Sequence, residues 1–269
     1  MEVASDNVTF ESLVQFWGMR PGRLELTRQT AKVAKLGEGR SVLEVGCGNG
    51  ISALFLSRQY ACNVIGIDAS DRMIALANQQ AEAKILSRRV QFLVADAMQL
   101  PFPDYTFDTV MCEAVLSGLV DKEKAAREFH RVLKCGGKVV ITDFVLRREI
   151  AKELQCQMTF LPCAGAKRLE EYVSLFEKAG LQDPYTEDHP EEMKRIGYWI
   201  ALNYGSVAKF FAKVAAGMYC LGKDGRQGAT SIEAYQEFFS QTTFGYALIA
   251  LTKPQASNCL PPSKRSVVL

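Results

Sequence analysis

The sequence predicts an α/β fold built on a doubly wound, mostly parallel β-sheet. From about residue 24 to residue 145, short runs that are apolar throughout alternate with segments of helical periodicity. Strands without polar alternation are typical of a parallel sheet covered by helices on both faces. The regular turn signals of a β-sandwich, expected every 8–12 residues or so, are missing. Together these observations favour strands joined by crossover helices.

Five strands and the helices between them are predicted in this first part. The strands are predicted as apolar runs at residues 41–45, 63–67, 90–94, 107–111 and 138–142. Glycines follow the first run, and aspartates close the second, third and fifth. The helices are predicted at residues 24–36, 51–59, 70–77 and 122–133, with Ser70 as an N-cap and Gly136-Gly137 as the stop of the last one.

The rhythm becomes irregular after residue 145. A helix over residues 169–179 ends at Gly180, and a strand is expected near residues 183–188. Pro190 opens a long, aromatic-rich helical stretch over residues 191–221. A further helix is expected at 231–239 and a final strand at 245–252.

Composition narrows the function classes. The 269 residues contain 32 Lys and Arg against 30 Asp and Glu, and this balance argues against a nucleic-acid partner. The eight cysteines form no C-x-x-C pair, so we expect no metal site and a reduced protein. Neither a leader peptide nor an apolar run long enough for a membrane span is visible, and a cytoplasmic location without membrane contact is expected.

The first strand leads into a glycine-rich segment that points to a bound cofactor. Gly46, Gly48 and Gly50 follow the strand directly, and glycine lets a backbone turn tightly and approach a ligand. Acids then end the next two strands, where Asp68 could accept ribose hydroxyls and Asp96 an adenine amino group. Such a series is far more specific than a lone glycine loop. A carboxylate at position 44 does not suit neighbouring phosphates and would suit an amino group.

Residues 42–143 resemble the class I methyltransferases that use S-adenosylmethionine. The similarity lies in Glu44–Gly50, Gly66–Asp68, Asp96-Ala97, Leu100–Asp108 and Arg127–Gly137, with Cys135 where the family usually has proline. It implies S-adenosylmethionine as cofactor, S-adenosylhomocysteine as product, and seven strands with the last antiparallel. The cofactor-binding residues that it implies are Glu44, Gly46, Cys47, Gly48, Asn49, Gly50, Asp68, Ala69, Met73, Asp96, Ala97, Cys112 and Glu113.

The resemblance also suggests how the chain is divided. Residues 1–30 are expected to form an N-terminal cap, and residues 31–253 a Rossmann-like methyltransferase domain. Within that domain, insertions at about 146–165 and 190–242 follow strands and should form a helical lid over the carboxyl edge of the sheet. Residues 254–269 are expected to be a mobile tail.

Methyl transfer from a sulfonium is an in-line displacement that mainly requires alignment in a dry pocket. A hydroxyl or protonated amine as acceptor would also require a base within hydrogen-bond reach. Glu113, Asp143 and His189 are the candidates, because each lies where a strand is expected to end. Each could equally be a helix cap or a surface group. His130, beside the apolar stripe of its helix, is expected to be structural.

The aromatic lid suggests a small-molecule acceptor that is apolar or planar. Trp17, Met19, Arg20 and Tyr198 are the residues expected to contact it, with the N-terminal segment closing the same face. The aromatic side chains could instead pack only on one another. A monomer or a homodimer fits the sequence equally well.

A second resemblance concerns the acceptor. Pro162–Tyr172 is similar to the stretch of arsenite methyltransferases in which a cysteine binds the metalloid, and Cys163 is the matching position. This similarity keeps methylation of a thiol or metalloid open, against Cys163 as a small buried side chain. Methylation of RNA or protein and a non-enzymatic, cofactor-binding scaffold are the remaining alternatives.

Overall fold

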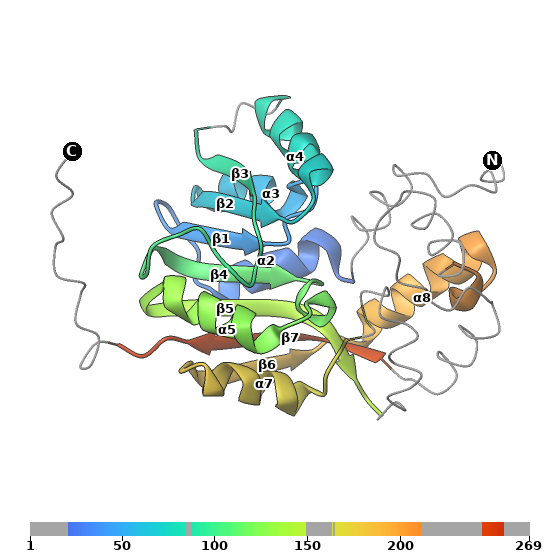
Figure 1. Cartoon of the computed structure of the whole chain (residues 1–269). Helices are drawn as coiled ribbons and strands as arrows, with labels where there is room; N and C mark the ends of the chain where they lie inside the picture. The colour runs from blue at the N-terminus through green and yellow to red at the C-terminus, as the bar shows by residue number, and fades with distance from the viewer. Residues whose placement is uncertain (1–20, 84–87, 149–162, 164, 211–243, 256–269) are drawn as a thin grey trace, which may run out of the picture.

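The computed structural model describes residues 21–83, 88–148, 163, 165–210 and 244–255 (Figure 1). In these residues seven strands form one sheet, and only β7 runs antiparallel to its neighbours. Its strands lie in the order β3 (Val90–Val94), β2 (Asn63–Asp68), β1 (Ser41–Val45), β4 (Phe107–Glu113), β5 (Leu133–Leu146), β7 (Phe244–Thr252) and β6 (Gln182–Asp188). The predicted α/β class and the antiparallel last strand are confirmed.

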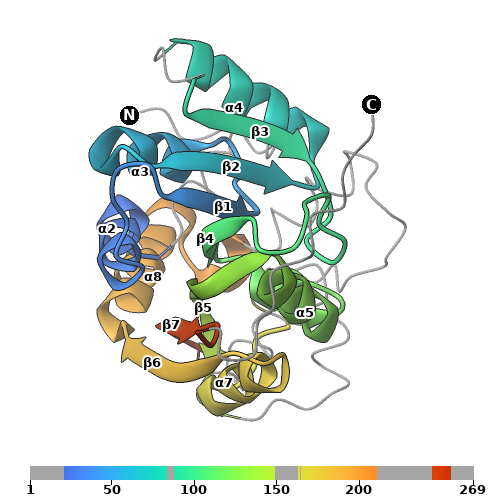
Figure 2. The ribbon, with the colours of Figure 1, turned by 90° about the vertical axis from the view of Figure 1, so that its left-hand side faces the viewer.

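Helices cover both faces of the sheet (Figure 2). One face carries α2 (Arg23–Val33), α3 (Ile51–Tyr60), α4 (Asp71–Ala83) and α8 (Pro190–Tyr204). The other face carries α5 (Lys122–Val132) and α7 (Leu169–Lys178), whose apolar sides bury Phe129 and Phe176 against the sheet. A short 3₁₀ turn, η1 (Leu116–Gly118), follows β4. The apolar strands are therefore covered from both sides, as their sequences predicted.

The transition from α5 to β5 differs from the prediction. Helix α5 ends at Val132, and β5 begins at Leu133 without an intervening loop. Gly136 and Gly137 do not stop the helix but lie inside β5, where its pairing with β4 shifts register. A Cβ on Gly137 would lie 2.8 Å from the Lys134 carbonyl oxygen and 2.9 Å from that of Asp108. The two glycines therefore permit a bulge, which a helix-stop signal resembles in sequence.

Helix α8 is shorter than the stretch predicted over residues 191–221. It ends at Tyr204, and Gly205 follows with a φ of +81°, the left-handed conformation that commonly ends helices. Pro190 does occupy the first turn of the helix, as the sequence predicted. Residues 211–221, the predicted helix at 231–239, the predicted cap up to residue 20 and the tail after residue 255 lie outside the described residues.

Candidate functional site

The segment from Gly46 to Gly50, called the glycine loop below, connects β1 to α3. Gly46, Gly48 and Gly50 have φ values of +69°, +54° and +80°, a region that residues with a Cβ rarely adopt. A Cβ on Gly46 would lie 2.3 Å from Val115 Cγ2, and one on Gly50 would lie 2.5 Å from Phe92 Cζ. A Cβ on Gly48 would meet no atom within 4 Å. The loop is therefore packed tightly at both ends and open in the middle.

Asp68 at the end of β2 holds the glycine loop in place. Its Oδ2 accepts a hydrogen bond from the Gly48 N–H at 3.0 Å, and its Oδ1 accepts one from the Ser70 N–H at 2.9 Å. Ser70 in turn accepts a hydrogen bond from the N–H of Met73, which is buried. The sequence assigned Asp68 to a ligand alone and did not reveal this contact with the loop.

The other predicted cofactor-binding residues are distributed around the same strand ends. Glu44 and Cys47 are buried, and burial together with the charges of Glu44 and Asp68 raises the pKa of the Cys47 thiol far above its usual value. Asn49 is half-buried and Ala69 is exposed. Asp96 is exposed and accepts a hydrogen bond from the Met98 N–H at 2.8 Å, whereas Ala97 is buried.

Glu113, at the end of β4, is surrounded by hydroxyl groups. Its carboxylate accepts hydrogen bonds from Thr27 Oγ1 at 3.1 Å, Ser52 Oγ at 3.0 Å and Thr30 Oγ1 at 3.4 Å. These donors belong to α2 and α3, so the carboxylate ties both helices to the sheet. The spacing of Thr27 and Thr30 on one face of α2 was the available signal in the sequence, and it was missed.

Asp143 is fully buried on the opposite face of the sheet from Glu113. Glu113 pairs with Thr142 in the β4–β5 register, and successive side chains of a strand alternate between faces. Asp143 accepts hydrogen bonds from Ser117 N–H at 2.9 Å, Ser117 Oγ at 2.6 Å and Phe144 N–H at 2.7 Å. Burial nevertheless raises its pKa to about 6. The structure thus separates two of the three candidate bases.

His189, the third candidate, lies between β6 and α8. Its N–H donates to the Tyr246 carbonyl oxygen at 2.8 Å, and its Nε2 lies 3.7 Å from Glu187 Oε1. His189 adjoins α8, whereas Glu113 contacts α2 and α3, and all three helices line the pocket described next. His130 is half-buried on α5, where burial lowers its pKa.

Cys163, considered for acceptor chemistry, and Cys112, predicted to bind the cofactor, are both buried. Burial raises the pKa of Cys163 to about 12 and that of Cys112 well above its usual value, with the charge of Asp143 acting in the same direction on both. Both thiols therefore stay protonated near neutral pH. Among the described residues, no three His, Cys, Asp or Glu side chains are grouped so that they could hold a metal ion.

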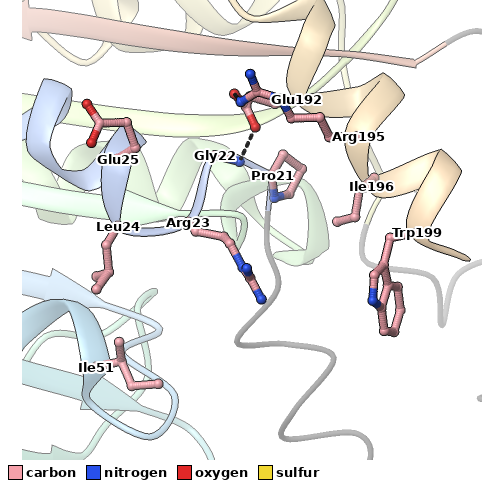
Figure 3. A pocket seen from close by; sticks show the side chains of 10 residues that line it. All are labelled: Pro21, Gly22, Arg23, Leu24, Glu25, Ile51, Glu192, Arg195, Ile196 and Trp199. Atoms are coloured by element: carbon pink, nitrogen blue, oxygen red, sulfur yellow. Dashed lines mark hydrogen bonds and ion pairs between the residues drawn. The ribbon is translucent and has the colours of Figure 1, made fainter. Parts of the chain in front are cut away.

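A cavity of about 690 Å³ lies between the start of α2, the start of α3 and helix α8 (Figure 3). We call it the α2–α8 pocket, and its lining residues are Pro21, Gly22, Arg23, Leu24, Glu25, Ile51, Glu192, Arg195, Ile196 and Trp199. Tyr198, predicted to contact the acceptor, is 76% exposed and does not line it, whereas its neighbour Trp199 does. Trp17, Met19 and Arg20 lie outside the described residues.

The two sides of the α2–α8 pocket are joined by a hydrogen bond. The Gly22 N–H donates to Glu192 Oε2 at 3.1 Å, across a separation of 170 residues in the chain. The residues that α8 contributes, 192, 195, 196 and 199, have the spacing of one helix face. That spacing was visible in the sequence, but nothing in it connected this face to residues 21–25. None of the helices among the described residues has the length and apolar character that crossing a bilayer requires.

Comparison with known proteins identifies a methyltransferase domain within the chain. The profile described as methyltransferase domain matches residues 43–141. Methyltransferase GfsG of Streptomyces halstedii is 28% identical over 85% of this chain and 80% of its own length. A phosphoethanolamine N-methyltransferase of Triticum aestivum is 30% identical, but this chain spans only 34% of that protein.

A solved structure supports the same relationship. The crystal structure of the [4+2]-cyclase SpnF is similar with a TM-score of 0.65 and 28% identity, over 86% of this chain and 80% of that one. The seven strands with the last one antiparallel, the glycine loop after β1 and the acid at the end of β2 agree with what the resemblance in sequence implied. Residues 43–141 therefore form a methyltransferase domain of the class I type, which uses S-adenosylmethionine.

Proposed function

We propose that the chain transfers the methyl group of S-adenosylmethionine to a small-molecule acceptor bound in the α2–α8 pocket. The observation that carries this proposal is the position of Ile51. It is the first residue of α3, directly after the glycine loop, and it also lines the pocket. A cofactor on the loop and a molecule in the pocket would therefore be neighbours, which in-line transfer requires. The pocket volume is in the range of small-molecule sites.

The proposed cofactor contacts follow the strand ends. Glu44 and the glycine loop would bind the methionine part, Asp68 the ribose hydroxyls, and Asp96 with Ala97 the adenine. The open space beside Gly48 supports this arrangement, because a ligand can approach the backbone there. Cys112 and Glu113 would lie near the methyl group, with Glu113 acting through its hold on α2 and α3.

The transfer forms one bond and breaks one. An acceptor lone pair attacks the methyl carbon, the carbon–sulfur bond breaks, and its electron pair returns to sulfur to give S-adenosylhomocysteine. An acceptor hydroxyl or amine also loses a proton. Two candidate bases adjoin elements that line the pocket. The His189 backbone carbonyl accepts the Glu192 N–H of α8, and the Glu113 carboxylate accepts hydrogen bonds from Thr27 of α2 and Ser52 of α3.

The alternatives receive less support. A thiolate at Cys163 is disfavoured by its burial and raised pKa. RNA or protein as acceptor would call for an extended basic or peptide-binding surface, whereas the pocket is small and mixed in charge. The division into a cap over residues 1–30, a domain over 31–253 with a lid, and a tail over 254–269 remains part of this proposal, as does a monomeric or homodimeric state.

The test combines binding with turnover. Isothermal titration should detect S-adenosylmethionine and S-adenosylhomocysteine, and Asp68→Asn should weaken both at least tenfold, because a neutral amide is a poorer acceptor for hydroxyls. Asp183→Asn is the matched control, since Asp183 is an exposed residue of β6 and its φ of +55° suits asparagine. Because a similar structure is that of a cyclase, turnover must be followed as S-adenosylhomocysteine formed. Folded protein that binds neither nucleoside would overturn the proposal.

A further inference from the structure

Two arginines and two glutamates line the α2–α8 pocket, but their partners are unevenly distributed. Both carboxylates of its lining already have partners. Glu192 accepts hydrogen bonds from the Gly22 N–H at 3.1 Å and from Arg195 at 2.6 Å, and Glu25 pairs with Arg28 at 3.4 Å. The Arg23 guanidinium, in contrast, makes no hydrogen bond or ion pair within the part of the chain that the structure describes. Among the described residues of the lining, Arg23 is therefore the cation whose side chain has no hydrogen-bond or ion-pair partner, whereas Arg195 is paired with Glu192.

The backbone at Arg23 is unusual. Gly22 and Arg23 have φ values of +78° and +46°, so two successive residues are left-handed at the start of α2. This conformation is unfavourable for an arginine, whereas glycine and asparagine adopt it more readily. Figure 3 shows the Arg23 side chain extending from this turn toward the space between Ile51 and Trp199. Strained residues persist mainly where the surrounding structure or a function requires them.

The rest of the lining is largely apolar. Leu24, Ile51, Ile196 and the indole of Trp199 contribute aliphatic and aromatic surface around the guanidinium. A guanidinium binds carboxylate or phosphate groups with two parallel hydrogen bonds, and such bonds are the strong ones. A ligand that matches this pocket would combine an anionic group with an apolar or planar body.

We propose that Arg23 determines acceptor specificity by binding an anionic group, carboxylate or phosphate, of the small molecule to be methylated. The inference rests on the proposed function, because it assumes that the α2–α8 pocket holds the acceptor. Arg23 takes no part in the bond changes. It orients the acceptor so that the nucleophilic atom faces the methyl group, while Trp199 and Ile196 cover the apolar body.

The experiment uses tritium-labelled S-adenosylmethionine and a bacterial metabolite extract that an anion-exchange resin has divided into retained and unretained fractions. Label should transfer to molecules of the retained fraction. Arg23→Asn removes the charge at a position where asparagine fits the backbone, so the variant should fold, and its KM should rise at least tenfold. The KM of Arg23→Lys should lie between those of the unaltered protein and Arg23→Asn. Arg127→Gln, which changes an exposed arginine of α5, is the control and should behave as the unaltered protein.

Titration with S-adenosylhomocysteine separates the possible outcomes. An affinity within twofold of the unaltered protein in Arg23→Asn, with the raised KM, supports the proposal. An equal loss of S-adenosylhomocysteine affinity would mean that Arg23 binds the carboxylate of the cofactor, and label found only in the unretained fraction would mean a neutral or cationic acceptor. Either result overturns the proposal. If S-adenosylhomocysteine binds but neither fraction is labelled, methyl transfer itself fails, and the role of Arg23 falls with it.

Discussion

The glycine loop and the α2–α8 pocket meet at Ile51, but they are built from different parts of the chain and by different means. The loop is backbone: three left-handed glycines, held by one carboxylate only 20 residues away. The pocket is lined by side chains, mainly from residues 21–25 and 192–199, two segments that a hydrogen bond joins across 170 residues. A ligand common to a whole family can be bound by conserved geometry of the backbone, whereas an individual acceptor must be recognised by side chains. The comparison predicts that substitutions in the two regions affect different ligands.

Alanine at Gly46 and at Gly48 should give the largest and most contrasting effects. Both substitutions place a Cβ on left-handed backbone, at about 1–2 kcal/mol. Gly46→Ala also forces a contact with Val115, where overpacking adds about 1–3 kcal/mol, so its urea midpoint should fall much further. Gly48→Ala adds a methyl group to open space, so it should lose S-adenosylhomocysteine affinity at least tenfold while remaining folded. Equal stability losses in the two variants, or unchanged affinity in Gly48→Ala, would contradict this assignment.

Substitution of Asp143 tests whether a change on the opposite face of the sheet alters stability without affecting ligand binding at the glycine loop or the α2–α8 pocket. The pKa of Asp143 is raised from 3.8 to about 6, which corresponds to roughly 3 kcal/mol. Between these pH values the unfolded chain has released the proton and the folded protein retains it, so stability falls as pH rises from about 4 to about 6. The free energies of unfolding in urea should therefore be compared for the unaltered protein and for Asp143→Asn. The difference between them should change from about pH 4 to about pH 6 and should be constant above that range.

The same two proteins provide the control for that prediction. Since Asp143 contacts Ser117 and faces away from Glu113, Asp143→Asn should leave S-adenosylhomocysteine affinity unchanged. A stability difference that does not vary between pH 4 and pH 6 would show that the folded-state pKa is not raised. A tenfold loss of affinity would show that the two faces are coupled.

Glu113→Gln should have a moderate effect that falls mainly on the acceptor side. The carboxylate holds α2 through Thr27 and Thr30, and losing hydrogen bonds to a buried charged group costs about 1.5–3 kcal/mol. Because α2 carries Arg23 and the glycine loop has its own contacts, acceptor KM should rise while S-adenosylhomocysteine affinity stays within a few-fold. Thr30→Val removes the 3.4 Å contact with Glu113 and the local 2.8 Å hydrogen bond to the Thr27 carbonyl oxygen but leaves the other two contacts of Glu113, so it should raise acceptor KM less. If cofactor affinity falls as much as KM rises, Glu113 serves both regions equally.

The smallest effect is expected for Cys163→Ala. Burial raises the pKa of this thiol to about 12, so it is protonated near neutral pH and is a poor nucleophile or metalloid ligand. Methyl transfer should be unchanged within twofold when S-adenosylhomocysteine formation is followed with the same acceptor fraction. A tenfold decrease at full S-adenosylhomocysteine affinity would favour the thiol or metalloid alternative.

The strands and the glycine loop were predictable because their signals are local. The apolar runs placed the ends of β1, β2 and β3 within one residue, whereas β5 extends several residues beyond the predicted 138–142 at both ends. Left-handed turns restrict the loop to glycine. The bulge at Gly136-Gly137 was misread as a helix stop, because both features use glycine for the same backbone freedom. Glu113 and Asp143 were both candidate bases because each follows a predicted strand. The pairing of Glu113 with Thr142, which puts Asp143 on the other face of the sheet, was not visible in the sequence.

The acceptor side could not be predicted to the same extent, because it depends on contacts between distant segments. The aromatic character of residues 190–204 suggested Tyr198, yet Trp199 is the aromatic residue that lines the pocket, and one residue along a helix changes the direction of a side chain by about 100°. The proposed role of Arg23 could not be predicted from the sequence either. It depends on Glu25 pairing with Arg28 and Glu192 pairing with Arg195 rather than with Arg23.

Amide hydrogen exchange with and without S-adenosylhomocysteine tests the central assignment most directly, because it locates the bound cofactor along the chain. We predict slower exchange in residues 46–50 and 68–70, where Gly48, Asp68 and Ser70 are already connected by hydrogen bonds. Residues 182–188 of β6, at the far edge of the sheet, should exchange at an unchanged rate. Unchanged exchange over residues 46–50 at saturating S-adenosylhomocysteine would contradict the placement of the cofactor on the glycine loop.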